Sequence, residues 1–364
     1  MSAERWTPEK AFEWYGSRPW LRGCNFMSSD CANRVDQWQE LGFEERLKTA
    51  DEELALAASI GFNTIRVIGE FHVWRRQHDS YLEHIDRYLE TASKHGISTM
   101  FVIGNDCSLP KRLYREPVMG EQSCDIGYHG GRKVSQHGSL PGETGWTVLD
   151  DPELHDEFMD MTREIISLHA HDDRICVWDM YNEAGNNNRS EICQPYLKEL
   201  FAAAREIAPD QPLTADIWGG ESAQVRELVL SLVDIVDFHS YGSFQNVAVL
   251  AERLKRTTKR PVICTEWLNR CLHNDVAEIF PLFYAMDIGC WCWGFVAGKY
   301  QTYEPWESLW KQIEAGNRDI DVTKWQHDLM RINHRPYDPK EIDVIRRFSA
   351  LADERYEEKR KGAE

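Results

Sequence analysis

Two glutamates each end a short apolar segment of the sequence. Glu183 closes the segment 176–183, and Glu266 closes the segment 261–266. Two carboxyl groups about 5–5.5 Å apart can break a glycosidic bond with retention, because one protonates the leaving oxygen while the other attacks the anomeric carbon. If both segments are strands whose ends meet, the sequence predicts a pair of carboxyl groups placed for this chemistry.

Other apolar segments also end in polar side chains. A strand that is buried in a parallel sheet normally consists of apolar residues throughout. In a parallel β/α barrel, the carboxyl ends of all strands open onto the face where active sites lie. The repeated pattern therefore predicts a ring of functional groups at one face. Besides the two glutamates, its members are Arg66, Asn182, Asp216, His239 and Tyr241.

The spacing of apolar residues predicts eight strand and helix units, which is typical of a parallel sheet covered by helices. The predicted strands are 20–26, 63–68, 97–103, 174–181, 212–217, 233–239, 261–265 and 290–295. The predicted helices are 43–60, 81–95, 152–169, 194–207, 222–232, 247–257, 274–286 and 340–353. Alternation along the last strand places Trp291, Trp293 and Phe295 on one face. We therefore expect an α/β fold, a (β/α)8 TIM barrel with long loops after strands three and eight.

The 364 residues fit a single domain, since β/α barrels often exceed 250 residues. We expect residues 20–355 to form the barrel and residues 356–364 a charged, frayed tail. Residues 1–19 form an N-terminal extension that is either a lid or a plug at the bottom of the barrel. Long loops in compact domains are usually functional. We expect those at 104–151 and 298–339 to wall the site with Tyr128, His129, Trp146, Tyr300, Tyr303, Trp306 and Trp310.

Composition argues against several kinds of partner. With 60 acidic and 42 basic residues, the formal net charge is -18, which opposes nonspecific binding of nucleic acid or of an anionic membrane. No apolar run approaches the ~18 residues of a membrane span. The first residues lack the basic and apolar regions of a secretory signal, so we expect a cytoplasmic protein. The ten cysteines include no CxxC pair, and we expect them to be free and mostly buried.

The residues at the predicted strand ends resemble clan A of the glycoside hydrolases, particularly the family 5 and family 2 barrels. The shared features are Asn-Glu ending strand four, Glu ending strand seven, Arg in strand two, His-x-Tyr after strand six and Trp in strand eight. The resemblance covers about residues 20–297 in strand order and is not a continuous alignment. It implies a retaining hydrolase of β-linked O-glycosides that forms a covalent glycosyl-enzyme intermediate and needs no cofactor or metal.

The resemblance also implies a role for each residue. Glu183 corresponds to the acid/base, Glu266 to the nucleophile and Asn182 to the residue that binds the sugar 2-hydroxyl. Arg66 and Tyr241 correspond to the groups that orient the nucleophile. Further contacts with the sugar are expected from His239, Trp293, Trp291 and Trp267, with either Trp293 or Trp291 as the platform under the ring.

The end of strand three departs from the family pattern, and the sequence does not determine the sugar or the oligomeric state. Strand three ends in Asn105 and Asp106, without the histidine typical of family 5 cellulases there, so cellulase activity is not implied. The sequence does not identify the sugar. Sugars differ in the orientation of their hydroxyl groups, and these are recognised by loop residues whose positions one sequence does not give. The expected partner is a carbohydrate, and exposed aromatic residues of the segment 298–339 could also serve a homodimer contact.

Two other functions fit the same residues. A quartet of strand-end residues could hold Mn²⁺, Mg²⁺ or Co²⁺, as in sugar isomerases and epimerases. Its members are Glu183, Asp216, His239 and Glu266. Such a site would not need the asparagine beside the first glutamate, Tyr241 or the tryptophans of strand eight. The 14 tryptophans could alternatively belong to a barrel that binds carbohydrate without catalysis.

Overall fold

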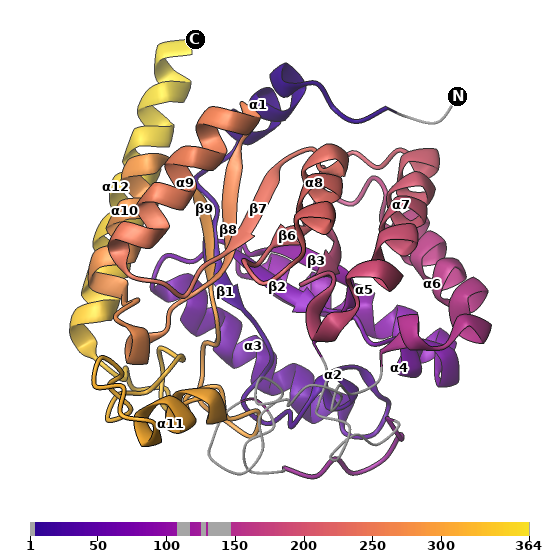
Figure 1. Cartoon of the computed structure of the whole chain (residues 1–364), viewed down its shortest axis with the longest axis horizontal. Coiled ribbons are helices and arrows are strands. Elements are labelled where there is room, and N and C mark those ends of the chain that lie inside the picture. The colour runs from indigo at the N-terminus through magenta and orange to yellow at the C-terminus, as the bar shows by residue number, and fades with distance from the viewer. Residues whose placement is uncertain (1–3, 108–116, 125–128, 130–146, 364) are drawn as a thin grey trace.

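The computed structural model describes residues 4–107, 117–124, 129 and 147–363. Parallel strands form a ring that helices surround, which is the (β/α)8 barrel expected from the sequence (Figure 1). The strands are β1 (Arg22–Asn25), β2 (Thr64–Ile68), β3 (Ser98–Asn105), β4 (Ile175–Asn182), β5 (Leu213–Thr214), β6 (Asp216–Ile217), β7 (Val236–His239), β8 (Val262–Trp267) and β9 (Gly289–Cys292). Each described strand lies inside a predicted strand or extends beyond it by at most two residues.

The fifth barrel strand is interrupted, which explains why eight predicted strands correspond to nine described segments. β5 pairs with β4 through Trp178 and Leu213, whereas β6 pairs with β7 through Asp216 and Asp237. Only Ala215 separates β5 from β6. The strand order in the sheet is β5-β4-β3-β2-β1-β9-β8-β7-β6, so β5 and β6 are its first and last strands. Because these two segments are halves of one interrupted strand, the chain between them closes the ring.

Helices follow the strands as the spacing predicted. The α-helices of the described residues are α1 (Pro8–Gly16), α2 (Arg34–Trp38), α3 (Phe43–Ser59), α4 (Phe71–Arg76), α5 (His78–Lys94), α6 (His155–Leu168), α7 (Ser190–Ile207), α8 (Ala223–Leu232), α9 (Phe244–Thr258), α10 (Val276–Met286), α11 (Glu307–Glu314) and α12 (Pro339–Ala363). Short 3₁₀ helices occupy Val148–Asp150, Pro152–Leu154, Asn186–Asn188 and Arg270–Leu272. None of the helices in these described ranges has the length and apolar character that crossing a membrane requires.

α1 closes one end of the barrel. It lies at the end of the strands opposite to α2 and α11 (Figure 1). Trp6 and Tyr15 pack there with Trp291 and with the strand residues Val177 and Ile263. Of the two roles expected for the N-terminal extension, the structure shows the plug.

The last barrel strand is shorter than predicted, because the chain leaves the sheet after Cys292. Gly294 has φ of 75°, and a Cβ atom there would lie 2.3 Å from Oδ1 of Asp328. Only glycine fits this turn without a shift of its neighbours. The prediction that Phe295 shares a face with Trp291 and Trp293 is therefore wrong: Phe295 follows the turn and packs against Phe26 and Phe62, whereas Trp293 lines the cavity.

The C-terminal tail also differs from its prediction. α12 continues to Ala363, so the expected frayed tail at 356–364 is helical over most of its length. The hydroxyl of Tyr356 donates to the Ser17 carbonyl at 2.8 Å, and Nζ of Lys359 donates to the Gly16 carbonyl at 3.0 Å. Both acceptors lie at the C-terminal end of α1, where helix carbonyls lack partners. All ten cysteines are free and eight are buried, as predicted.

Candidate active site

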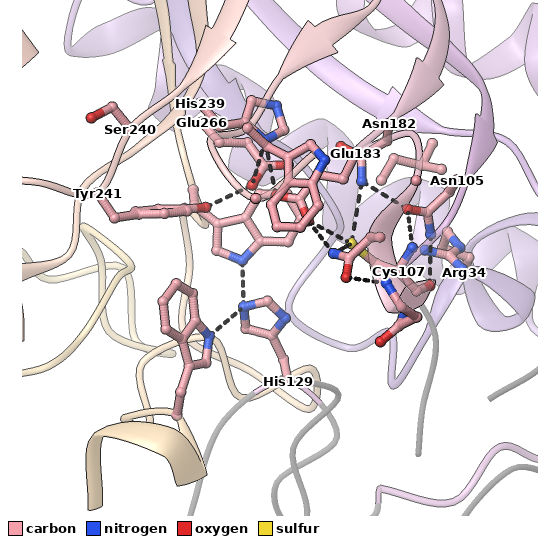
Figure 2. A pocket seen from close by; sticks show the side chains of 18 of the residues that line it. Arg34, Asn105, Cys107, His129, Asn182, Glu183, His239, Ser240, Tyr241 and Glu266 are labelled. Carbon is pink, nitrogen blue, oxygen red and sulfur yellow. Dashed lines mark hydrogen bonds and ion pairs between the residues drawn. The ribbon is translucent and has the colours of Figure 1, made fainter. Parts of the chain in front are cut away.

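A cavity of about 530 Å³ lies at the carboxyl ends of the strands (Figure 2). This volume is within the range of ~300–1,000 Å³ typical of small-molecule sites. Six of the predicted site residues line the cavity: Asn182, Glu183, His239, Tyr241, Glu266 and Trp293. The common strand-end position of these residues thus brings most of the predicted ring together.

The two glutamates meet across this cavity. One carboxylate oxygen of Glu183 lies within 4.8 Å of one oxygen of Glu266. Only 7% of Glu183 and 4% of Glu266 is exposed. An approach of at most 4.8 Å between one oxygen of each is compatible with direct nucleophilic attack, for which the two carboxyl groups lie ~5–5.5 Å apart. The geometry therefore suits double displacement.

Glu266 accepts a hydrogen bond on each of its oxygens. Nη1 of Arg66 donates to Oε1 at 3.0 Å, and the hydroxyl of Tyr241 donates to Oε2 at 2.7 Å. Burial raises the pKa of the Glu266 carboxyl, and His239, Arg66 and Tyr241 oppose that rise. The two donors aim at the ionised form, so they orient this carboxylate and favour its negative charge.

Arg66, in β2, connects Glu266 to residues of β1 and β4. Its Nε and Nη2 donate to Oδ2 of Asp179 at 3.0 and 2.7 Å, its Nη2 donates to Oδ1 of Asn182 at 2.7 Å, and its Nη1 donates to Oδ1 of Asn25 at 2.8 Å. Burial alone would lower the pKa of Arg66, but the carboxylates of Asp179 and Glu266 raise it. The guanidinium therefore stays charged and holds the barrel centre together.

Glu183 is also held on both oxygens. Nδ1 of His239 lies 3.1 Å from Oε1, Nδ2 of Asn186 donates to Oε2 at 2.7 Å, and the thiol of Cys107 donates to Oε2 at 3.0 Å. Burial raises the pKa of the Cys107 thiol, so its sulfur keeps the proton that it donates. In Figure 2, Cys107 lies on the side of the cavity away from Tyr241, and His239 lies beside Glu266.

His239 contacts both Glu183 and Thr265. Burial lowers the pKa of His239 to about 4, so the imidazole is neutral near pH 7. The hydroxyl of Thr265 lies 3.1 Å from Nε2 of His239 and 2.7 Å from Oδ2 of Asp237. A neutral imidazole has one donor nitrogen and one acceptor nitrogen, so His239 links the Glu183 carboxyl group to Thr265 and Asp237 in one chain of hydrogen bonds.

Trp293 forms a wall of the cavity, as expected for a sugar platform. Its indole N–H donates to Nε2 of His129 at 2.7 Å, and the two rings stack with centroids 5.1 Å apart. The other two tryptophan candidates lie elsewhere. Trp291 is fully buried in the cluster beneath the barrel, and Trp267 packs against Phe280 and Phe283 of α10. The structure therefore does not bring Trp291 or Trp267 to the site.

Sequence reasoning missed several cavity residues. Trp218 follows β6, Asn105 ends β3 and Cys107 follows it, so the strand-end rule would have found all three. The indole of Trp218 donates to the carbonyl of Ala184 at 3.2 Å, which fixes this ring beside the Glu183 turn.

The aromatic residues expected to wall the site divide into three groups. His129, Tyr300 and Trp306 line the cavity. Tyr303 and Trp310 are not among its described lining residues. Tyr128 and Trp146 lie outside the described residues.

The structure also assembles the four residues of the alternative metal site. Nδ1 of His239 lies 3.1, 3.6 and 3.7 Å from carboxylate oxygens of Glu183, Glu266 and Asp216. Both oxygens of Glu266, however, already accept from Arg66 and Tyr241. A guanidinium in contact with a ligand carboxylate repels a second cation, so the donor set fits a metal less well than a nucleophile.

No protein-family model and no curated protein matches the sequence. Solved structures do resemble the barrel. The exo-beta-1,4-mannosidase Op5Man5 from Opitutaceae bacterium strain TAV5 is 16% identical over 93% of this chain, with a TM-score of 0.59, and this chain covers 60% of its length. The GH5_18 protein from Streptomyces cattleya in complex with GlcNAc is 14% identical over 93% of this chain and 81% of its own, with a TM-score of 0.58. A variant of that protein in complex with Manb1-4GlcNAc is 13% identical over 91% and 80%, with a TM-score of 0.56. At this identity, the likeness establishes a shared fold.

Proposed function

We propose that the chain is a retaining O-glycoside hydrolase that cleaves β-linked glycosides, with Glu266 as nucleophile and Glu183 as acid/base. The observation that supports this most strongly is the separation of the two buried carboxyl groups, at most 4.8 Å between one oxygen of each. Donors from Arg66 and Tyr241 favour a carboxylate at Glu266. His239, Asn186 and Cys107 hold the Glu183 carboxyl group in the cavity opposite this nucleophile.

In the first step, Glu266 attacks the anomeric carbon while Glu183 gives its proton to the leaving oxygen, and the carbon–oxygen bond to the leaving group breaks. In the second step, Glu183 takes a proton from water as the water oxygen attacks that carbon, and the bond to Glu266 breaks. Asn182 would bind the 2-hydroxyl through its amide, whose orientation is set by Arg66 on one side and Asn105 on the other.

The cavity offers a face for each half of a small glycoside. Trp293 lies near the nucleophile and would support the glycone ring, while Trp218 and Asn186 lie beside Glu183 and would contact the leaving group. The solved structures of similar fold include an exo-beta-1,4-mannosidase and a complex with Manb1-4GlcNAc. We therefore propose β-mannosides as the first substrates to test.

Action in the cytoplasm and the formation of a homodimer stay predictions.

Metal-dependent sugar isomerisation is the second candidate, because His239 faces three carboxylates at 3.1–3.7 Å. A barrel that binds carbohydrate without catalysis is the third.

A hydrolysis screen separates these candidates. Nitrophenyl α- and β-glycosides of several sugars would be incubated with the protein, with and without EDTA. Release from a β-glycoside that is unaffected by EDTA supports the proposal. Interconversion of free sugars that EDTA abolishes would support the metal site, and binding without turnover would support the third candidate.

The nucleophile has its own test within the same screen. Glu266→Ala should lose activity and regain product formation with azide, giving a glycosyl azide of inverted configuration. Glu90→Gln, which changes an exposed carboxylate of α5, should match the unmodified protein. A folded Glu266→Ala protein that binds substrate but that azide does not rescue would contradict the assignment.

A further inference from the structure

Glu183 has a backbone conformation that residues with a side chain rarely adopt. Its φ angle is 48°, in the left-handed region. For residues other than glycine this region is unfavourable, because Cβ approaches the following carbonyl oxygen. β4 ends at Asn182, so Glu183 is the residue at which the chain turns out of the sheet. A contact from outside the turn is needed to hold this conformation.

The contact comes from the interrupted fifth strand. Oδ1 of Asp216 accepts a hydrogen bond from the backbone N–H of Glu183 at 2.8 Å. Within the turn, the Glu183 carbonyl accepts from the backbone N–H of Asn186 at 3.0 Å. Oδ2 of Asp106 accepts from the backbone N–H of Gly185 at 2.8 Å. Asp216 thus replaces the strand-to-strand hydrogen bond that the Glu183 N–H would otherwise make.

Asp216 is buried, and only one of its two carboxyl oxygens accepts a hydrogen bond from the described residues. Its Oδ2 has no hydrogen-bond partner among the described residues and lies 3.7 Å from Nδ1 of His239. Burial and the carboxylates of Asp179, Asp237 and Glu183 raise the pKa of Asp216, and Arg66 opposes that rise. Because Oδ1 accepts the Glu183 N–H, the retained proton belongs on Oδ2. Asparagine is a close mimic of this neutral form, since it keeps the acceptor and the shape.

We infer that Asp216 is the positioning residue of the acid/base: its carboxyl oxygen holds the Glu183 backbone in the left-handed region and so aims the Glu183 side chain at the leaving oxygen. This inference rests on the function proposed above for Glu183. It gives Asp216 a role by hydrogen bonding in place of the metal ligation considered from the sequence. It also gives a reason for the break at Ala215, which separates the short strand segment that bears Asp216 from β5.

Crystal structures of Asp216→Ala and Asp216→Asn test the contact without relying on activity. In Asp216→Ala, Glu183 should relax to negative φ and its carboxyl group should move away from His239. In Asp216→Asn, the φ angle near 48° and the contact with His239 should persist. If the alanine variant does not fold, Asp216→Ser replaces it, because the serine side chain is too short to keep the acceptor position. A Glu183 that keeps its positive φ without the acceptor would overturn the inference.

Kinetics then test whether the position matters to catalysis. General acid catalysis contributes ~10²–10⁴-fold. Asp216→Ala should therefore lose at least about tenfold more kcat/KM on a disaccharide than on a dinitrophenyl glycoside, whose leaving group departs without protonation. Asp216→Asn should stay within about threefold of the unmodified protein on both. Equal loss on the two substrates would mark a merely structural role and overturn the inference.

A double-mutant cycle completes the test. If Asp216 acts through Glu183, adding Asp216→Ala to Glu183→Ala should lower the dinitrophenyl glycoside rate no further. A further drop would contradict action through Glu183. Failure of the unmodified protein to hydrolyse any glycoside would refute the proposed function, whereas the crystal structures would still decide the backbone contact.

Discussion

Replacement of Tyr241 by phenylalanine should move the acid side of the pH profile upward. The Tyr241 hydroxyl donates to Oε2 of Glu266 at 2.7 Å, and this hydrogen bond lowers the pKa of a carboxyl group that burial raises. A hydrogen bond to a charged group contributes about 1.5–3 kcal/mol. Because one pKa unit corresponds to about 1.36 kcal/mol, loss of the hydroxyl should raise the pKa of Glu266 by about 1–2 units.

The sign follows from the role proposed for Glu266. A nucleophile must be ionised, so activity falls as the pH falls through its pKa. Raising that pKa moves the loss of activity to higher pH. Glu266 is only 4% exposed, so solvent screens the lost interaction very little.

The measurement is kcat/KM against pH, which reports the ionisations of the free enzyme. A dinitrophenyl glycoside is the suitable substrate, because its leaving group needs little help from Glu183. Tyr303→Phe is the matched control, since Tyr303 packs against Trp325 and its profile should not move. An acid limb that stays in place, or moves to lower pH, in a Tyr241→Phe protein that still binds substrate would refute the assigned interaction between Tyr241 and Glu266.

Three further perturbations test other parts of the molecule. Glu183→Ala should lower kcat on a disaccharide by ~10²–10⁴-fold but affect the glycosylation step of a dinitrophenyl glycoside much less; equal losses would remove its acid role. Trp218→Ala should lower kcat/KM for a disaccharide about tenfold, equivalent to about 1.4 kcal/mol of lost contact, and leave hydrolysis of a glycosyl fluoride unchanged; an effect on the fluoride would place Trp218 outside the leaving-group side. Asp328→Asn tests a buried acid whose pKa burial raises to about 7. Since this folded-state value exceeds the unfolded one, the free energy of unfolding should fall as the pH rises from about 4 to about 7, and the asparagine variant should lack up to about 4 kcal/mol of that fall. Urea unfolding at several pH values measures it, and an unchanged pH dependence would exclude Asp328 as its source.

The barrel could be predicted because its strands alternate with helices at regular spacing and end in polar residues. Arg66 lies in β2, Glu266 lies in β8 and Glu183 directly follows β4, yet the parallel barrel places all three strand ends at one face. That rule was sufficient to bring six predicted residues to the cavity. Applied without exception, it would also have found Asn25, Asn105 and Trp218, which end or follow β1, β3 and β6.

The tryptophan assignments failed for two different physical reasons. Trp267 follows Glu266 directly in β8, and successive strand side chains point to opposite faces, so alternation alone excluded it from the cavity. Trp293 could not be separated from Trp291 in this way. Trp291 lies in β9 among residues beneath the site, whereas Trp293 follows the end of β9 and lines the cavity, so the difference is one of depth along the barrel, which depends on where the strand ends.

The choice between a nucleophile and a metal ligand depends on charge balance, which strand-end spacing does not reveal. Glu183, Asp216, His239 and Glu266 meet within distances that could suit a cation, so the sequence pattern predicted both chemistries for the same side chains. What separates the two is Arg66, whose guanidinium contacts both Asp179 and Glu266. A permanent positive charge at this position already supplies what a metal ion would add. The site contains more carboxyl groups than this one positive charge can balance. Protons balance the rest, as the raised pKa values of Asp216 and Asp237 indicate. A site that balances its charge with protons is suited to acid/base chemistry, and this favours the hydrolase over the isomerase.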